Sequence, residues 1–179
     1  MMEEIANRVS TNTKYPDFLC YYFRNRPSFR SVLDKGESQA KEFLSRHDTA
    51  WRCRDDYIGF RLEVEAWVRA EFIRKGGQPK RVHPIYLSLG IEKILEKDPS
   101  YTGKLILPLH IFTRTQLSLT YLDSMHTAEG RRPIVFMKDN IVEMIDRHGS
   151  GYNEVQVWDD APLSTIREQY LSSGKLDYR

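Results

Sequence analysis

Cysteine is scarce in this sequence, and long apolar runs are absent. The 179 residues contain two cysteines, Cys20 and Cys53, whose spacing fits neither a metal site nor a disulfide framework. No apolar stretch approaches the ~20 residues that cross a bilayer, and the opening MMEEIANRVSTNTKY is too polar and acidic for a secretory signal. These absences predict a cytoplasmic protein with reduced cysteines and no membrane partner.

The motifs of several common enzyme families are missing as well. The sequence has no P-loop, no HExxH, no paired CxxC and no GxSxG. The glycines of KGGQPKR, residues 75–81, stand beside cations but do not lead from a strand into a helix, as those of a phosphate-binding loop do. The five histidines are scattered without the spacing of metal ligands, so no metal site is predicted.

Positive charge gathers in the first half of the chain. The formal net charge is +2, but residues 1–82 hold 16 Lys and Arg against 12 Asp and Glu, whereas residues 83–179 hold 11 against 13. Clustered cations attract nucleic acid and phosphorylated cofactors. Because carboxylates are interleaved throughout, a salt-bridged helical surface is the simpler interpretation. The cations in question are Arg24, Arg26, Arg30, Arg52, Arg54, Arg74, Lys75, Lys80 and Arg81.

Hydrophobic patterning predicts a single α+β domain, in which a helical half (residues 1–81) packs on a small mixed β-sheet formed by residues 82–179. The clearest helix lies within residues 54–77, where apolar residues recur at helical spacing and Gly76-Gly77 ends the pattern. After residue 82, short apolar or alternating runs predict strands separated by brief helices and turns. The expected strands lie in VHPIYLSLG, GKLILPLHIF, QLSLTYLDSM, PIVFMKD and YNEVQVWDD.

Three short segments of the second half occur in an order that a known fold shares. Pro84–Leu87 belongs to a tyrosine-bearing strand, Thr120–Ser124 leads from a strand into a polar loop, and Glu154–Val157 is a glutamate-bearing strand that a proline and an isoleucine follow. Across residues 82–170, this order resembles ADP-ribosyltransferase-like folds. It is most similar to the DarT-type toxins, which use NAD to modify DNA bases.

The resemblance implies a catalytic role for Glu154. The bond between nicotinamide and ribose breaks through an oxocarbenium-like state, which a carboxylate beside the ribose stabilises. Gln156, two residues further along the same strand face, would position the acceptor or the cofactor. Tyr86 or Tyr121 would stack on the nicotinamide, and Ser124 would support the glutamate.

The sequence departs from this family at the cofactor-binding strand. Family members place an arginine just after this strand to hold the nicotinamide ribose and the phosphates, but here LSLGIEK follows Tyr86. Arg81 or His83 would take its place from the other end of the strand. The resemblance further implies NAD as a substrate, a DNA or RNA base as the acceptor, and an antitoxin or another protein as a partner.

The glutamate-bearing strand also has an interpretation without catalysis. Glu154 and Gln156 alternate with Val155 and Val157, as residues do on a strand with one solvated face. The chain would then be a non-enzymatic module that binds nucleic acid or protein through its basic half. A third interpretation is an α+β domain whose likeness to the family is accidental.

The interpretations predict different surroundings for Glu154. An enzyme requires Glu154 in a concave pocket, facing Tyr86, Tyr121 and either Arg81 or His83. A binding module predicts an exposed Glu154 on a flat surface, with the cations forming a continuous patch elsewhere.

Overall fold

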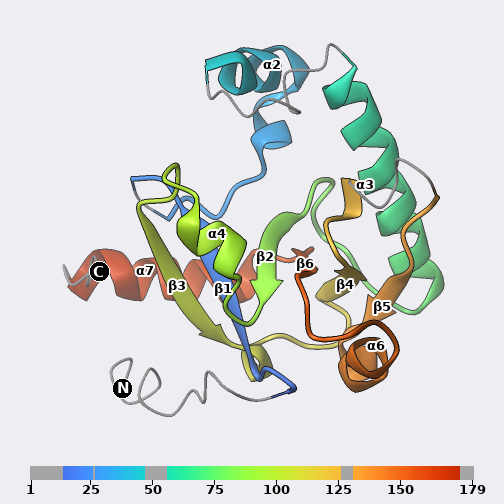
Figure 1. Ribbon diagram of the computed structural model, residues 1–179. Coiled ribbons are helices and arrows are strands. Elements are labelled where there is room, and N and C mark those ends of the chain that lie inside the picture. Colours follow the sequence, from blue (N-terminus) through green and yellow to red (C-terminus); the bar gives the residue numbers. More distant parts are fainter. Residues whose placement is uncertain (1–13, 26, 47–55, 126–130, 174–179) are drawn as a thin grey trace.

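A computed structural model describes residues 14–25, 27–46, 56–125 and 131–173 (Figure 1). These residues form five α-helices and a six-stranded sheet with the strand order β3-β1-β2-β6-β4-β5. The α+β architecture is therefore confirmed. Every strand pairing in the sheet is antiparallel, which corrects the expectation of a mixed sheet, because hydrophobic patterning indicates strands but not their direction.

The elements agree well with the expected segments. Each of the five expected strand segments contains one strand, and the long helix lies within its expected range. The strands are β1 (Phe18–Phe23), β2 (Ile85–Leu89), β3 (Gly103–Pro108), β4 (Leu117–Tyr121), β5 (Val135–Met137) and β6 (Asn153–Val157). The helices are α2 (Glu37–Arg46), α3 (Tyr57–Arg74), α4 (Lys93–Lys97), α6 (Ile141–His148) and α7 (Ala161–Ser173), with 3-10 turns η1 (Val32–Lys35), η2 (Leu109–Ile111) and η3 (Lys138–Asn140).

The first half of the chain contributes a strand as well as helices. The run FLCYYF forms β1, which pairs with β3 along its whole length and with β2 through Leu19 and Cys20. Both faces of β1 are largely buried, so its sequence lacks the alternation that marks a strand with one wet face. Residues 1–81 are therefore not a purely helical layer, because β1 lies between two strands of the second half.

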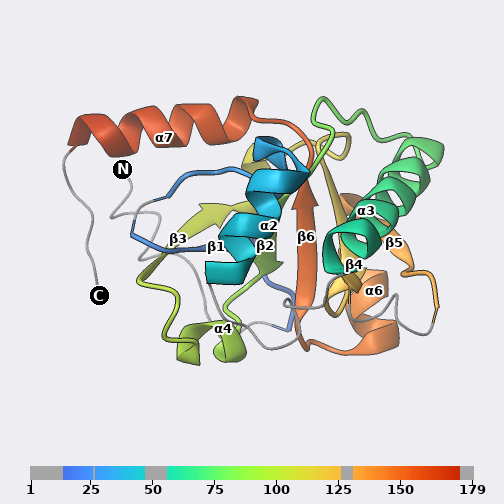
Figure 2. The ribbon, with the colours of Figure 1, turned by 90° about the horizontal axis from the view of Figure 1, so that it is seen from above.

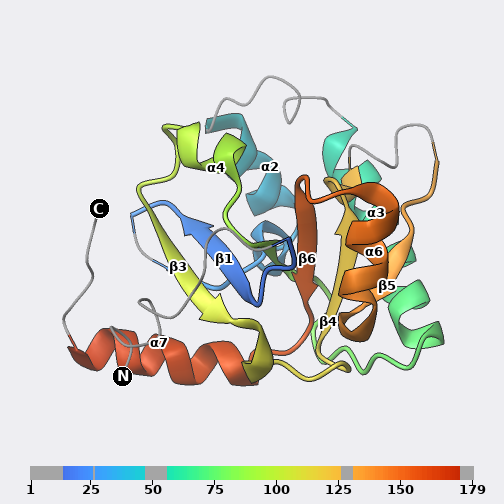
Figure 3. The same ribbon diagram turned by 60° about the horizontal axis from the view of Figure 1, so that its bottom comes forward.

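The two faces of the sheet differ in chemistry. One face, here called the apolar face, carries aliphatic and aromatic side chains from all six strands and packs against α6 and α7. In Figure 3, α6 lies on the near side of β4 and β5. The opposite face, here called the polar face, lies on the side of α2 and α3, and Figure 2 shows α2 in front of it. At its centre are Tyr86, Ser88, Ser118, Thr120, Glu154 and Gln156.

Helix α3 covers one end of the polar face. Its apolar stripe includes Val64, Val68 and Phe72, which pack around Trp158, and the Phe72 and Trp158 rings lie 6.1 Å apart. The chain leaves the helix at Gly77, where a Cβ atom would lie 2.5 Å from the Phe72 ring, so only glycine permits this close approach. None of the described helices is long and apolar enough to cross a membrane.

Candidate active site

A cavity of about 470 Å³ opens on the polar face beside α3, and Glu154 lies in its wall. This volume falls within the ~300–1,000 Å³ that is common for small-molecule sites. The walls come from β1, β2, β6, η1, α3, α4 and the loop after β4. Tyrosines supply much of the lining, through Tyr22, Tyr57, Tyr86, Tyr101 and Tyr152.

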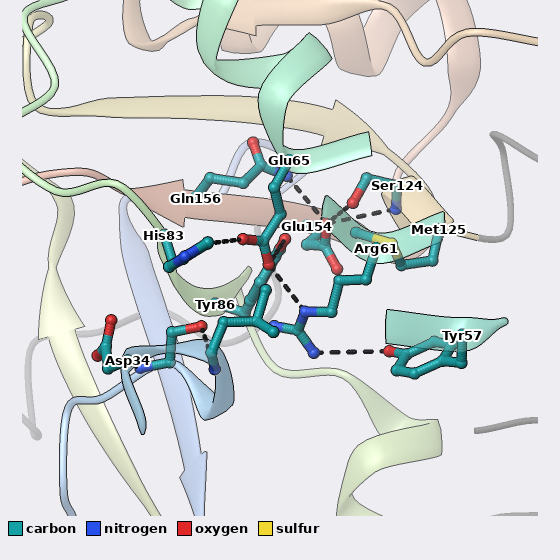
Figure 4. Close-up of polar contacts among 12 residues, drawn as sticks. Asp34, Tyr57, Arg61, Glu65, His83, Tyr86, Ser124, Met125, Glu154 and Gln156 are labelled. Atoms are coloured by element: carbon teal, nitrogen blue, oxygen red, sulfur yellow. Dashed lines mark hydrogen bonds and ion pairs between the residues drawn. The ribbon is translucent and has the colours of Figure 1, made fainter. Parts of the chain in front are cut away.

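The Glu154 side chain is 5% exposed and is held through one of its two oxygens (Figure 4). The Ser124 hydroxyl donates to Oε1 at 2.6 Å, the Ser124 backbone N–H donates to it at 3.3 Å, and Gln156 Nε2 donates to it at 2.9 Å. Among the described residues, no donor binds Oε2. The carboxylate is therefore fixed in position while one oxygen remains available to a ligand in the cavity.

The loop after β4 places Ser124 and Asp123 beside this carboxylate. Thr120 is paired with Glu154 in the sheet, so the chain leaves β4 close to the glutamate. Leu122 then adopts a φ of 61°, which is unfavourable for a bulky side chain, and its N–H donates to the Tyr152 carbonyl at 2.9 Å. Backbone strain of this kind persists where the surroundings enforce it and is frequent at functional sites.

A row of hydrogen bonds runs along the polar face towards Glu154. Trp158 Nε1 donates to the Ser118 hydroxyl, which donates to Gln156 Oε1, at 2.9 and 2.8 Å. Gln156 Nε2 in turn donates to Glu154 and to Thr120. Gln156 is completely buried, so the interpretation of Glu154 and Gln156 as a solvated face is wrong: helices and the loop after β4 cover this face as well as the other.

Burial changes the acidity of Glu154. Desolvation raises the pKa of its carboxyl group from 4.5 to about 8, and the nearby Asp123 carboxylate acts in the same direction, while the bonds from Ser124 and Gln156 oppose the rise. A carboxyl group with a pKa in this range exchanges its proton near neutral pH. Such groups are frequent among catalytic residues, because proton transfer is most efficient when the pKa lies close to the working pH.

Helix α3 contributes a buried ionic network to the cavity wall. The Glu65 side chain, 2% exposed, accepts bonds from Arg61 Nε at 2.8 Å and from the Tyr86 hydroxyl at 3.0 Å, and it contacts His83 Nδ1 at 2.7 Å (Figure 4). The Arg61 guanidinium also lies over the Tyr86 ring, 4.9 Å from its centroid, and bonds the Tyr57 hydroxyl. Glu65 therefore holds a cation and an aromatic ring together at the edge of the cavity.

The structure brings some of the predicted site residues together and separates others. Glu154 and Tyr86 both line the cavity, and Ser124 and Gln156 hold Glu154 from behind. Tyr121 lies on the opposite face, because Thr120 faces the glutamate and neighbouring side chains on a strand alternate. There the Tyr121 ring stacks on His148, with centroids 4.9 Å apart.

Arg81 and His83 lie outside the cavity wall. Arg81 is engaged by two carboxylates, those of Asp34 and Asp160, and its Nε donates to the His83 carbonyl. His83 reaches the cavity only through Glu65, which separates it from Tyr86. The expectation that either residue replaces the missing arginine after β2 is therefore not met by their positions.

Sequence reasoning missed Arg61, Glu65 and Asp123. The first two are four residues apart on α3, and Glu65 directly follows Val64 on the buried side of the helix. A carboxylate within an apolar stripe was a signal for a buried network, since an acidic residue is almost never fully buried unless it is paired. Asp123 precedes Ser124 in the polar loop that the sequence had singled out.

The described residues contain no group of three or more His, Cys, Asp or Glu side chains that could hold a metal ion. Comparison of the chain with protein-family models, with curated proteins and with solved structures finds no match. The geometry of the cavity around Glu154 is therefore the basis on which a function can be inferred.

Proposed function

We propose that this protein is an NAD-dependent ADP-ribosyltransferase-like enzyme with Glu154 as its catalytic carboxylate and a nucleic-acid base as its acceptor. The observation that carries the proposal is the state of Glu154: buried in a cavity wall, fixed through Oε1 and open at Oε2. The β6 strand and the bonds from Ser124 and Gln156 hold the group rigidly, as a preorganised catalytic site requires.

The carboxylate suits the breaking of a glycosidic bond. As the bond between C1′ of the ribose and the nicotinamide nitrogen breaks, the electron pair leaves with nicotinamide and positive charge develops at C1′. Oε2 of Glu154 would accept a bond from a ribose hydroxyl and stabilise that charge. A nitrogen of the acceptor base would then attack C1′ and lose its proton to water. The cationic ring of bound NAD would itself favour the ionised form of Glu154 and so lower its pKa.

The rest of the wall offers matching partners for a dinucleotide. Tyr86 and the neighbouring tyrosines present flat apolar surfaces to a nicotinamide or an adenine ring. The Arg61 guanidinium has five N–H groups, and its bonds to Glu65 and Tyr57 use two of them. The others could bind a phosphate or a ribose oxygen, so Arg61 is a candidate for the role first assigned to Arg81 or His83.

The alternative of a non-enzymatic module bound through the basic half has less support. Many of the described cations there are already engaged: Arg74 with Glu71, Lys80 with Asp159, and Lys75 with the Val135 carbonyl. The carboxylates of Glu71 and Asp159 offset part of the positive charge that the module would present to an anionic partner. Arg26, Arg52 and Arg54 lie outside the described residues.

Thermal-shift titration with NAD tests the proposal. Ligand that binds only the folded state stabilises it by ~2.7 kcal/mol at a concentration 100 times its Kd, so the Tm of the wild type should rise with NAD. Tyr86→Ala should remove the rise, measured against the Tm of that variant without ligand. Tyr121→Ala, on the opposite face, is the matched control and should keep it. Equal shifts in both variants, or no shift in the wild type at millimolar NAD, would contradict the proposal.

A further inference from the structure

A second cavity of about 330 Å³ lies between the segment after β1 and the first turns of α7. We propose that it binds a phosphate group of a ligand that extends from the Glu154 cavity. That one ligand occupies both cavities rests on the proposed function. The binding of a phosphate in the second cavity does not. Its lining offers two hydroxyl groups and three exposed cations, from Ser28, Arg30, Lys35, Ser164 and Arg167.

The charges in this cavity favour an anion. Its lining includes four cations and two carboxylates, and both carboxylates, Asp34 and Asp160, bind the same cation, Arg81. Arg30, Lys35 and Arg167 are exposed, and within the described part of the chain no carboxylate forms an ion pair with them. Together with Arg81 and its two carboxylates, these three cations give the lining a net charge of +2. This charge attracts a phosphate, and the attraction is stronger in a concave site than on a flat surface.

The backbone presents these groups in a fixed arrangement. Phe29 has a φ of 47°, and its N–H donates to the Tyr21 hydroxyl while its ring packs on the Tyr21 ring at 4.6 Å. This strained residue turns the chain, so that its exposed neighbours Ser28 and Arg30 both line the cavity. On the other wall, Ser164 and Arg167 are three residues apart on α7 and therefore lie on one side of the helix.

Arg30 connects the two cavities. It lines both of them, and the residues that follow divide between the two: Ser31 and Val32 line the Glu154 cavity, and Asp34 and Lys35 line the second one. The turn η1 is thus the wall between them, and Arg30 lies two residues before the turn begins. A ligand whose sugar occupies the first cavity could place a phosphate against Arg30 and Arg167 in the second.

Two kinds of ligand carry such a phosphate: the dinucleotide, with its pyrophosphate, and a nucleic-acid acceptor, with its phosphodiester backbone. Calorimetric titration with inorganic pyrophosphate, with NAD and with a short single-stranded DNA separates them. The variants are Arg167→Gln and Lys35→Gln, both on the exposed rim of the second cavity, and the matched control is Arg147→Gln, an exposed arginine on α6. The Tm of each variant is measured to show that it is folded.

We expect the wild type and Arg147→Gln to bind pyrophosphate alike, and Arg167→Gln to bind it about 10- to 100-fold more weakly, the usual effect of losing one charge-assisted bond. Lys35→Gln should weaken binding in the same direction. A parallel loss of NAD affinity would assign the site to the dinucleotide. A loss confined to DNA, with the slope of log K against log salt reduced by about 0.7, would assign it to the nucleic-acid backbone.

No binding of pyrophosphate to the wild type, or equal binding by Arg167→Gln, Lys35→Gln and Arg147→Gln, would overturn the phosphate site. This failure is distinct from failure of the proposed function. A wild type that releases nicotinamide from NAD, while all three variants bind pyrophosphate and DNA as the wild type does, would overturn the phosphate site alone. Weakened phosphate binding in a protein that never releases nicotinamide would overturn the enzymatic proposal and leave the phosphate site standing.

Discussion

Replacing Glu154 with glutamine should stabilise the folded protein at alkaline pH and change its stability little at acidic pH. The carboxyl group is buried, and desolvation raises its pKa from 4.5 to about 8. The folded state therefore holds this proton more tightly than the unfolded chain does. Glutamine keeps an oxygen that can accept the bonds from Ser124 and Gln156, but it has no proton to lose.

The sign and the size of the effect follow from this difference in pKa. Below pH 4.5 the carboxyl group is protonated in both states, and the stabilising effect of the raised pKa is fully present. As the pH rises from 4.5 to about 8, the unfolded chain ionises first and this stability is progressively lost. Each unit of difference between the pKa values of the folded and unfolded states corresponds to ~1.4 kcal/mol. The difference between 4.5 and about 8 therefore amounts to about 5 kcal/mol of lost stability once the folded state is also ionised.

Urea unfolding at pH 4, 7 and 9 measures this effect. The free energy of unfolding of Glu154→Gln, relative to that of the wild type, should increase steadily with pH. Glu168→Gln, which alters an exposed glutamate on α7, is the matched control and should follow the wild type. Parallel pH profiles for wild type and Glu154→Gln would refute the reasoning, because they would show that Glu154 ionises in the folded state as readily as in the unfolded one.

Three further predictions follow from the same contacts. Glu65→Gln should lower the free energy of unfolding by about 3–5 kcal/mol in urea, because Arg61 is buried against this carboxylate; a loss below ~1 kcal/mol would contradict the pairing. Trp158→Phe should cost about 1 kcal/mol or more by the same measurement, since Ser118 loses the indole donor, and an unchanged stability would argue against the row of hydrogen bonds. The kcat/KM for nicotinamide release should rise with pH around an apparent pKa near 8, as Glu154 ionises. A flat profile between about pH 6 and 9 would show that the activity does not depend on the ionisation of Glu154.

The sequence was sufficient to predict most of the strands, the long helix α3 and the strand on which Glu154 lies. Apolar runs and alternation located β2 to β6, and a helical stripe located α3, because these patterns follow directly from side-chain geometry. β1 was missed because it is buried on both faces and so has no alternation. The strand directions and the strand order depend on long-range pairing, which local patterns do not encode.

The surroundings of the site were predicted less well than the glutamate itself. Alternation correctly placed Gln156 on the same strand face as Glu154, but it suggested solvent where the structure has a buried hydrogen-bond network. The same alternation excludes Tyr121 from the cavity, once the register of β4 against β6 is known. Arg61 could not be assigned to the cavity from the sequence, since its place depends on how α3 packs across the polar face.

Release of nicotinamide from NAD, measured chromatographically with single-stranded DNA or RNA as the acceptor, tests the central claim most directly. The wild type should release nicotinamide and leave ADP-ribose on the nucleic acid. Glu154→Gln should do neither while remaining folded, and Glu168→Gln should match the wild type. Nicotinamide release that is equal in wild type and Glu154→Gln, or absent from the wild type with NAD bound, would contradict the account of Glu154 as the catalytic carboxylate.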